Sequence, residues 1–236
     1  MKIIRSVAIA ILASISASSA MAVDDRQAAR AKYSELAAKV RAGDLGIDWK
    51  ALRVAAAIGE VGEPTEGLLA GEKAYAALNK GEFADALKIG REIEDHNIAD
   101  VDAHYLAWRS LVGLGRENEA EKERVLLAAL LQSNTDSGDG KSVKTAWFAT
   151  TIREVYLYMG AVLNVQSQEH RTWKQDDHYY DVIAVKDKDG KQMVLWFNCD
   201  TEMQRQVAAG ERATHSKKRN MDSVVTSTCI AIKRAD

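Results

Sequence analysis

Hydrophobic residues recur at helical spacing through the first half of the chain. Gly43 ends the first such segment, and further helices are predicted over 65–79 and over about 49–58, where Asp48 is a good N-cap residue. The first segment places its apolar side chains on one helix face, at Ala29, Tyr33, Leu36, Ala37 and Val40.

Two stretches of this helical half resemble each other. Gly81 and Gly115 are 34 positions apart, and so are Ala86 and Ala120. This spacing is the period of tetratricopeptide repeats, which are helix–turn–helix units. Two copies are too few for a free-standing repeat array, which needs about three. We therefore expect a tetratricopeptide-like helical pair that packs against the rest of the chain.

Two further helices are predicted before residue 133. The run Val125–Leu131 is apolar at every position, and a helix that is apolar all round is buried on both sides. We expect it to be the central helix of the fold. The preceding helix, from about Val101, is expected to place four side chains on one face, at Val101, Tyr105, Trp108 and Val112.

From Ser133 onward the pattern becomes strand-like, after a polar loop over 133–142. Two runs rich in β-branched and aromatic residues, 179–185 and 193–199, flank an Asp-Gly turn and predict a β-hairpin over about 179–199. The other predicted elements are a strand at 145–151, a short helix at 152–160, a strand at 162–167, a short helix within 201–210 and a last strand at 224–232.

These elements predict an α+β fold, in which an N-terminal tetratricopeptide-like helical layer packs on a small, mainly antiparallel C-terminal sheet. The predicted boundaries place a leader at 1–22, the helical region at 23–134 and an α+β region at 135–236. The last region carries the hairpin and a C-terminal tail.

The leader has the pattern of a cleaved export signal. Lys2 and Arg5 precede a short apolar run, and Ala20-Met21-Ala22 offers an A-x-A cleavage site. The run is shorter than the roughly 20 apolar residues of a spanning helix. We expect cleavage after Ala22 and a periplasmic or secreted protein, with no stable membrane insertion once the leader is removed.

Charge removes one class of partner. The chain carries 32 basic and 34 acidic side chains. Loss of the leader would remove Lys2 and Arg5 and leave a net charge of about −4, which gives no electrostatic footprint for nucleic acid. The short basic segment 215–219 is interpreted as a solvated loop.

The chain has two cysteines, Cys199 and Cys229. In an oxidising compartment so sparse a pair is often a disulfide. The alternative is two buried free thiols, because Cys199 follows an apolar strand pattern. No C-x-x-C spacing supports thiol-redox chemistry or a zinc site.

Candidate catalytic residues are few, and none belongs to a complete motif. In Gly138-Asp139-Gly140-Lys141-Ser142, Thr135 stands where a phosphate loop needs glycine, so a tight loop with Asp139 bonded to local amides is favoured. His104, within a predicted helix, is interpreted as a core or cap residue.

A second group of candidates lies near the hairpin. His178 and Asp181 belong to the densest group of titratable side chains, although neighbouring strand residues point to opposite faces. His170 and His178 are placed on either side of a polar turn, which is a poor spacing for metal ligands. The catalytic candidates are therefore His104, Asp139, His178 and Asp181, and no metal or cofactor site is predicted.

Aromatic residues gather in the second half of the chain. Most are expected to pack the sheet against the helix over 125–131. If several were exposed, they would mark a carbohydrate- or peptide-binding surface. These residues are Trp147, Phe148, Trp173, Tyr179, Tyr180, Trp196 and Phe197.

Four groups of short motifs follow one another over about 33–203. They are Gly43-Asp44 with Ile47-Asp48-Trp49 and Ala51-Leu52-Arg53, Ala86-Leu87 with Asp102-Ala103-His104, Ser137-Gly138-Asp139-Gly140-Lys141-Ser142 with Thr145-Ala146, and Asp181-Val182 with Trp196-Phe197-Asn198. In order and spacing they resemble a bacterial family called domain of unknown function 4919. The chain departs from its pattern at 59–66 and in the tail beyond about Gln204. The resemblance implies a layout and no activity, substrate or catalytic residue.

Three functions are compatible with these patterns. Export, the helical pair and the lack of a catalytic motif favour a non-catalytic binding or interaction module of the cell envelope, which would hold a protein, a peptide or an envelope component. The alternatives are an envelope hydrolase that uses the four candidates, and a stress or assembly factor without a small ligand. The oligomeric state is not specified by any pattern.

Overall fold

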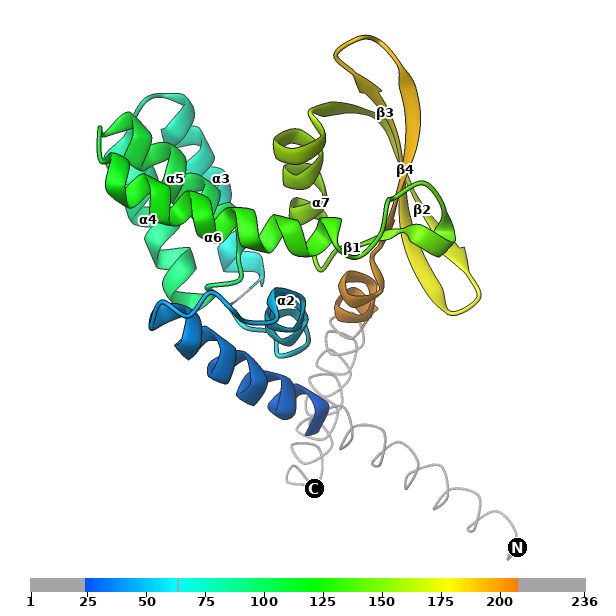
Figure 1. Cartoon of the computed structure of the whole chain (residues 1–236), viewed down its shortest axis with the longest axis horizontal. Helices are drawn as coiled ribbons and strands as arrows, with labels where there is room; N and C mark the ends of the chain where they lie inside the picture. Colours follow the sequence, from blue (N-terminus) through cyan, green and yellow to red (C-terminus); the bar gives the residue numbers. More distant parts are fainter. Residues whose placement is uncertain (1–23, 63, 208–236) are drawn as a thin grey trace, which may run out of the picture.

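The structure, a computed structural model, describes residues 24–62 and 64–207. The predicted export signal, the basic segment 215–219, the last strand at 224–232 and Cys229 lie outside these residues. Within them the fold is α+β, as predicted, with helices in the first part and a four-stranded sheet in the second (Figure 1). No described helix is both long and apolar enough to cross a membrane.

The helical part spans residues 24–135. The first helix ends at the predicted place, before Gly43, which has a φ of +88°. The second helix begins after Asp48 as predicted, because the Asp48 side chain accepts a hydrogen bond from the Ala51 amide. In chain order the part contains a helix over 24–41, α2 (Trp49–Ile58), α3 (Pro64–Asn79), α4 (Phe83–His96), α5 (Val101–Gly113) and α6 (Glu117–Thr135).

Gly81 and Gly115, the two glycines that are 34 positions apart in the similar stretches, end α3 and α5 in the same way. Gly81 and Gly115 have φ angles of +78° and +71°. After each, the next amide donates to a carbonyl five residues back, from Glu82 to Ala77 and from Arg116 to Leu111, both at 2.9 Å. This is the Schellman arrangement that a left-handed residue permits. Each glycine turn therefore joins two packed helices, α3 to α4 and α5 to α6.

α5 is the most enclosed helix of this part, since α3, α4, α6 and α7 all contact it. Its predicted buried face was wrong at Val112, which is 51% exposed, whereas Leu106, Ala107 and Leu111 are buried. α6 reaches from α5 and α2 to α7 and β1 (Figure 1). It is not buried on both sides as predicted, because Ala128 is exposed. The prediction was wrong because alanine, which counts as apolar in the run Val125–Leu131, is also found at exposed helix positions.

The sheet has the order β1-β4-β3-β2. β3 (His178–Asp187) and β4 (Gln192–Asn198) form the predicted hairpin, in which Gly190 has a φ of +84°. β2 (Val165–Gln175) pairs antiparallel with β3, and β1 (Trp147–Phe148) pairs parallel with β4. The connections contain a 3-10 turn at Val143–Thr145, α7 (Ile152–Tyr158) and a π-helical turn at Met159–Leu163.

Two strand predictions were wrong in extent. The strand predicted at 145–151 is only the two-residue β1, and the one predicted at 162–167 begins at Val165 but continues to Gln175. The polar turn expected between His170 and His178 is therefore largely strand. β2 lies at the sheet edge with nearly every side chain exposed, so it lacks the apolar alternation that marks a half-buried strand.

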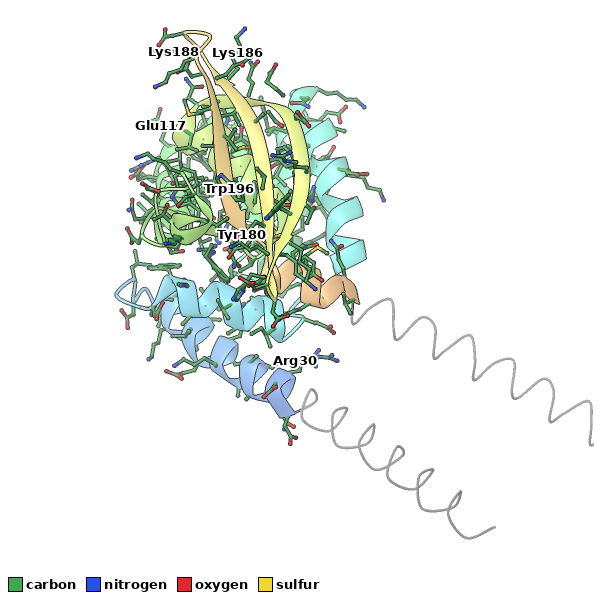
Figure 2. The ribbon with its side chains drawn as sticks, turned by 90° about the vertical axis from the view of Figure 1, so that its right-hand side faces the viewer. Arg30, Glu117, Tyr180, Lys186, Lys188 and Trp196 are labelled. Carbon is green, nitrogen blue, oxygen red and sulfur yellow. The ribbon has the colours of Figure 1, made fainter. Side chains whose placement is uncertain are left out.

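The helical part and the residues after it share one hydrophobic core. Leu52 of α2, Leu130 of α6, Val155 of α7 and Phe197 of β4 belong to a single buried cluster. α7 lies on the inner side of the sheet, and Figure 2 shows the outer side, with Tyr180 and Trp196 labelled.

The aromatic side chains noted in the sequence are mostly buried or partly buried: Trp147, Tyr180 and Phe197 are buried, and Phe148, Tyr179 and Trp196 are partly buried. Trp147 packs against Tyr158 and Phe197, with ring centroids 5.1 and 5.3 Å apart. On the outer side Tyr180 is buried, and Trp173 is exposed to 45%. A binding surface would have required several exposed aromatic side chains, and of the seven only Trp173 is exposed.

Candidate functional site

A cavity of about 610 Å³ lies where α2, the α4–α5 connection, the start of α7 and the final described helix over 200–207 meet. We call it the junction cavity. Its size falls within the range of small-ligand sites, about 300–1,000 Å³. Its walls combine apolar side chains, such as Ala57, Val61 and Ile152, with charged ones.

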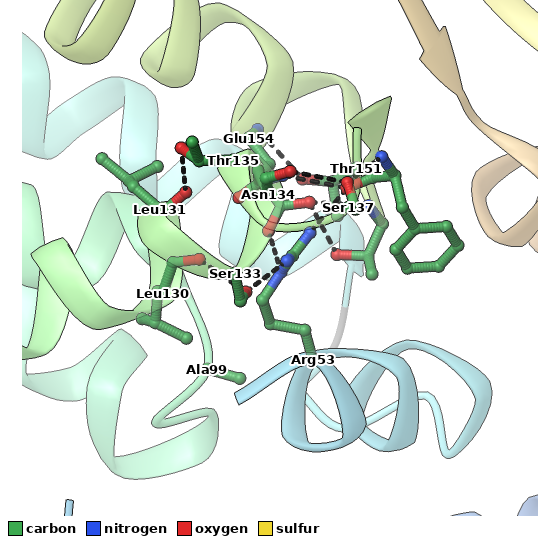
Figure 3. A network of polar contacts seen from close by, with 12 residues as sticks. Arg53, Ala99, Leu130, Leu131, Ser133, Asn134, Thr135, Ser137, Thr151 and Glu154 are labelled. Carbon is green, nitrogen blue, oxygen red and sulfur yellow. Dashed lines mark hydrogen bonds and ion pairs between the residues drawn. The ribbon is translucent and has the colours of Figure 1, made fainter. Parts of the chain in front are cut away.

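Arg53 and Glu154 both line the junction cavity, and they belong to one network of polar contacts (Figure 3). Arg53 Nε lies 2.5 Å from Glu154 Oε1, and its other two nitrogens donate to Ser133 Oγ at 2.5 Å and to the Phe148 carbonyl at 3.0 Å. The second Glu154 oxygen accepts a bond of 2.6 Å from the Thr150 amide. Every charged group of this enclosed pair is therefore bonded, and the network ties α2, α6, β1 and α7 together.

A second ion pair forms one wall. Arg153 Nε lies 2.8 Å from Asp102 Oδ2, and Tyr75 Oη donates to Asp102 Oδ1 at 2.6 Å. Burial first, and the charge of Asp102 second, raise the pKa of Tyr75, so the phenol remains a donor. Gly71 of α3 leaves room for this pair, because a Cβ there would lie 2.6 Å from the Arg153 guanidinium. Glu202 and Arg205, which also line the cavity, form a third ion pair.

Asp100 lines the junction cavity without a charged partner. It is partly buried, and it caps α5 by accepting a 3.0 Å bond from the Ala103 amide to Oδ1. No basic side chain in the described part of the chain forms an ion pair with it. Burial, and then the nearby charge of Asp102, raise its pKa to about 6. The site thus contains a carboxyl group that titrates near neutrality.

His104 is a core residue, as the sequence analysis favoured. Its Nδ1 lies 2.8 Å from Glu123 Oε2 and its Nε2 lies 2.8 Å from the Ile98 carbonyl. Neither acceptor carries a hydrogen, so both ring nitrogens donate and the ring is an imidazolium. Burial alone would lower the pKa of His104, but Glu123, the charge of Glu94 and the Ile98 carbonyl together raise it.

Arg91 completes this cluster, because its Nη1 lies 2.5 Å from Glu94 Oε2 and 2.5 Å from Glu123 Oε1. Ligand atoms of Glu94, His104 and Glu123 lie within 4.8 Å of one another, as a metal site would require. However, Arg91 and the imidazolium already balance the two carboxylates. A metal ion would have to displace one cation and deprotonate the other, so this donor set fits a structural ion cluster that joins α4, α5 and α6.

Asp139 lies in the loop between α6 and β1, as predicted. It accepts a bond from the Lys141 amide at 3.1 Å, and a hydrogen bond with Thr145, followed by that amide, lowers its pKa. The loop is held to the sheet, because the Gly140 carbonyl accepts a 2.8 Å bond from the Trp196 amide. A Cβ at Gly140 would lie 2.2 Å from the Trp147 ring, so close packing explains the glycine.

His178 and Asp181 both lie on β3 but bond to different partners. His178 Nδ1 lies 2.6 Å from Asp200 Oδ2, at the start of the final described helix. Asp181 Oδ1 lies 2.9 Å from His170 Nε2, whose Nδ1 is 3.3 Å from Tyr156 Oη. Sequence reasoning did not find this pairing, because it ended the strand at 167 and placed His170 beside a polar turn, where no cross-strand partner is expected.

The four catalytic candidates therefore do not converge. His104 lies in the helical core, Asp139 in a loop, and His178 and Asp181 in two separate pairs. None of the four lines the junction cavity, as far as the described residues extend.

Cys199 is buried at the end of β4 and has no disulfide partner among residues 24–62 and 64–207. Burial first, and then nearby carboxylates such as Asp181, raise the pKa of its thiol to about 12. Such a thiol is a poor nucleophile, since the thiolate is the reactive form. Because Cys229 lies outside the described residues, the Cys199–Cys229 bridge stays a prediction.

Comparison with protein-family models, with curated proteins and with solved structures finds no match for this chain.

Proposed function

We propose that the chain is an exported, non-catalytic binding module of the cell envelope whose ligand site is the junction cavity. The observation that carries the proposal is the cavity itself, of about 610 Å³, at the meeting of the helices and the residues that follow them. Its three arginines are each fixed by an acidic partner, in the pairs Arg53–Glu154, Arg153–Asp102 and Arg205–Glu202.

The groups around the cavity favour binding over hydrolysis. A hydrolase that forms a covalent intermediate needs a side-chain nucleophile within hydrogen-bond reach of a base. The hydroxyls in the described lining belong to Thr150 and Thr151, and both have structural bonds. Thr150 Oγ1 donates to Glu154 Oε2 at 3.2 Å, and Thr151 Oγ1 accepts a bond of 3.2 Å from the Glu154 amide at the start of α7.

Three finer parts of the proposal rest on separate observations. Export is supported by the pattern of the first 22 residues. Tetratricopeptide-like character is supported by the matching turns at Gly81 and Gly115. Membership of the domain of unknown function 4919 family is supported by the four motif groups, which include the helix cap Asp48 and the paired core residue His104.

The experiment tests the proposal with a variant, Val61→Trp, whose larger side chain would fill part of the cavity. The mature chain is incubated with envelope extract, and retained ligand is detected by native mass spectrometry for the wild type, Val61→Trp and the matched control Val112→Trp. Val61 lines the cavity, whereas Val112 is an exposed residue of α5 outside it. We expect the wild type and Val112→Trp to retain the same ligand and Val61→Trp to lose it. Equal retention by all three, or retention by none, would contradict the proposal.

One observation favours a hydrolase as the alternative. Asp181 bonds to Nε2 of His170, and Nδ1 of that ring lies 3.3 Å from the Tyr156 hydroxyl oxygen. A panel of ester, amide and glycoside substrates would be tested with the wild type, His170→Ala and, as a control, His96→Ala. Turnover that is lost only in His170→Ala would support this alternative.

A further inference from the structure

We infer that the junction cavity takes an organic cation, a guanidinium or primary ammonium group like that of an arginine or lysine side chain, with Asp100 as its counter-ion. The inference rests on the proposed function, because it names the chemical class of the ligand for the same cavity. Four observations carry it: the balance of charges, the position of Asp100, the state of the arginines and the apolar lining.

The balance of charges in the cavity is negative. Each arginine of the lining has an acidic partner, so these pairs cancel. Two carboxylates of the lining, Glu92 and Asp100, form no ion pair with a described residue. His96 is exposed and directs its Nδ1 at the backbone carbonyl of Glu92. An entering cation would therefore meet unbalanced negative charge.

Asp100 has the position of a counter-ion. One oxygen accepts the Ala103 amide, and no side chain in the described part of the chain donates to the other. Capping α5 does not need this charge, because asparagine and serine cap helices about as well as aspartate. Holding an ionised carboxylate in a partly buried place is unfavourable. The charges of His104 and Arg153 reduce this cost but form no ion pair with Asp100, and the pKa of Asp100 stays raised. A bound cation would remove that cost, so the ligand would supply what the fold lacks.

The arginines are unsuited to an anionic ligand. Arg53 is fully buried, and its three nitrogens donate hydrogen bonds to Glu154, Ser133 and the Phe148 carbonyl. Arg153 is held by Asp102. An anion at Arg53 would have to break one of these bonds and leave Glu154 unpaired. An anion at Arg153 would share the guanidinium charge with Asp102, which already pairs with its Nε.

A metal ion fits no better than an anion. Both oxygens of Asp102 are used, by Tyr75 and Arg153, so Asp100 and the exposed Glu92 are the described lining carboxylates left to ligate a metal. Hard divalent ions take six or more oxygen ligands. A side chain with a cationic head and an apolar stem matches the lining better, because its methylenes would lie along Ala57, Val61 and Ile152.

The cation has two possible sources. A ligand in solution would bring it from outside. The chain also carries Lys217, Lys218 and Arg219, ten or more residues beyond Val207 at the end of the final described helix. Ten residues of chain can span up to about 35 Å, which is a sufficient length of chain for a tail to return to a cavity that Arg205 lines.

The test titrates the mature chain with N-acetyl-argininamide by isothermal calorimetry at about pH 8, where Asp100 is ionised. N-acetyl-glutamine amide and calcium chloride serve as the neutral and metal probes. Asp100→Asn keeps the helix cap and the shape of the side chain while removing the charge, and Asp189→Asn in the hairpin turn is the matched control. We expect the arginine probe to bind the wild type and Asp189→Asn equally, and Asp100→Asn at least tenfold more weakly. Equal binding to Asp100→Asn, or tighter binding of either other probe, would overturn the inference.

Two further arms separate the sources. If the basic tail occupies the cavity, replacing Lys217, Lys218 and Arg219 by alanine tightens probe binding at least tenfold, and adding Asp100→Asn removes that gain. If the cation comes from solution, the wild type and the triple variant bind the probe equally. Absence of probe binding in both forms would overturn the inference.

The same variants separate this inference from the proposed function. Loss of the envelope ligand in Val61→Trp but not in Asp100→Asn would leave the cavity as the binding site and refute Asp100 as counter-ion. Retention of the ligand in both variants would refute both statements.

Discussion

Nε of Arg53 lies 2.5 Å from Oε1 of Glu154, although 101 positions separate the two residues in the chain. The bond joins α2 to α7, and both side chains are enclosed. Because both residues also line the junction cavity, the shape of the candidate site depends on the packing of the helical part against the residues that follow it.

Arg53→Met should be strongly destabilising. It leaves the Glu154 carboxylate buried without its cation, and breaking one side of a buried pair costs about 3–5 kcal/mol. Urea unfolding at pH 7 would measure the loss. The double variant Arg53→Met/Glu154→Gln should lose less than the two single losses combined, because no lone charge remains. Additive losses would show that the two groups do not act as a pair.

Asp100→Asn should be stabilising at neutral pH. The folded pKa of about 6 lies above the ordinary 3.8, so the stability linked to this carboxyl group is fully present below about 3.8 and is lost as pH rises through about 6. Asparagine does not ionise, so the variant does not lose this free energy of unfolding as pH rises, and its side chain still caps α5. Unfolding curves should show a gain that grows between about pH 4 and 6 and levels off near 2–3 kcal/mol above it. A destabilised variant at pH 8 would contradict this prediction.

His104 should make stability depend on alkaline pH. Its folded pKa is raised above 6.5, so its contribution is fully present below about 6.5 and is lost as pH rises through the raised value. The difference in free energy of unfolding between the wild type and His104→Gln should therefore be larger near pH 6 than near pH 9. A difference that is constant with pH would mean that the ring is neutral in the folded protein.

Gly140→Ala should disrupt the loop between α6 and β1. Gly140 has a φ of +64°, and an added Cβ would lie 2.2 Å from the Trp147 ring, so a loss of about 2–4 kcal/mol is expected in thermal or urea unfolding. Gly160 is the matched control, since its added Cβ meets nothing within 4 Å. Gly160→Ala should be neutral or stabilising by up to about 1 kcal/mol.

Cys199 should react slowly with thiol reagents in the reduced, folded protein. A thiol pKa of about 12 in place of 9.0 lowers the thiolate fraction on the order of a thousandfold, and burial adds to the effect. Mass spectrometry of labelled peptides would follow Cys199 and Cys229 separately, before and after unfolding in urea. In the oxidised protein, a peptide pair that contains both cysteines would support the predicted disulfide.

Local signals made the helical part and the hairpin predictable. Asp48, Gly43 and the Asp189-Gly190 turn act through bonds a few residues away, and their effects are readable in a short window. β2 was misread because an exposed edge strand can be polar on both faces. Tertiary position, and not local pattern, makes it a strand.

The candidate site was much less predictable than the fold. Arg53 was noted as part of a motif, but its partner lies on another helix 101 residues later. Asp100 is recognisable in the sequence as a helix cap, yet its lack of a counter-ion depends on which elements surround it. Searching for catalytic residue types pointed to His104 and His178, which have other roles.

Two lining residues of the junction cavity, Glu202 and Arg205, come from the last helix that the structure describes. A polypeptide is made from its N-terminus, so Arg53 and Asp100 emerge about a hundred residues or more before this wall exists. The cavity is therefore complete only after Glu202 and Arg205 have been added to the chain. A growing chain that still lacks this helix has Arg53 and Asp100 but no closed pocket between them.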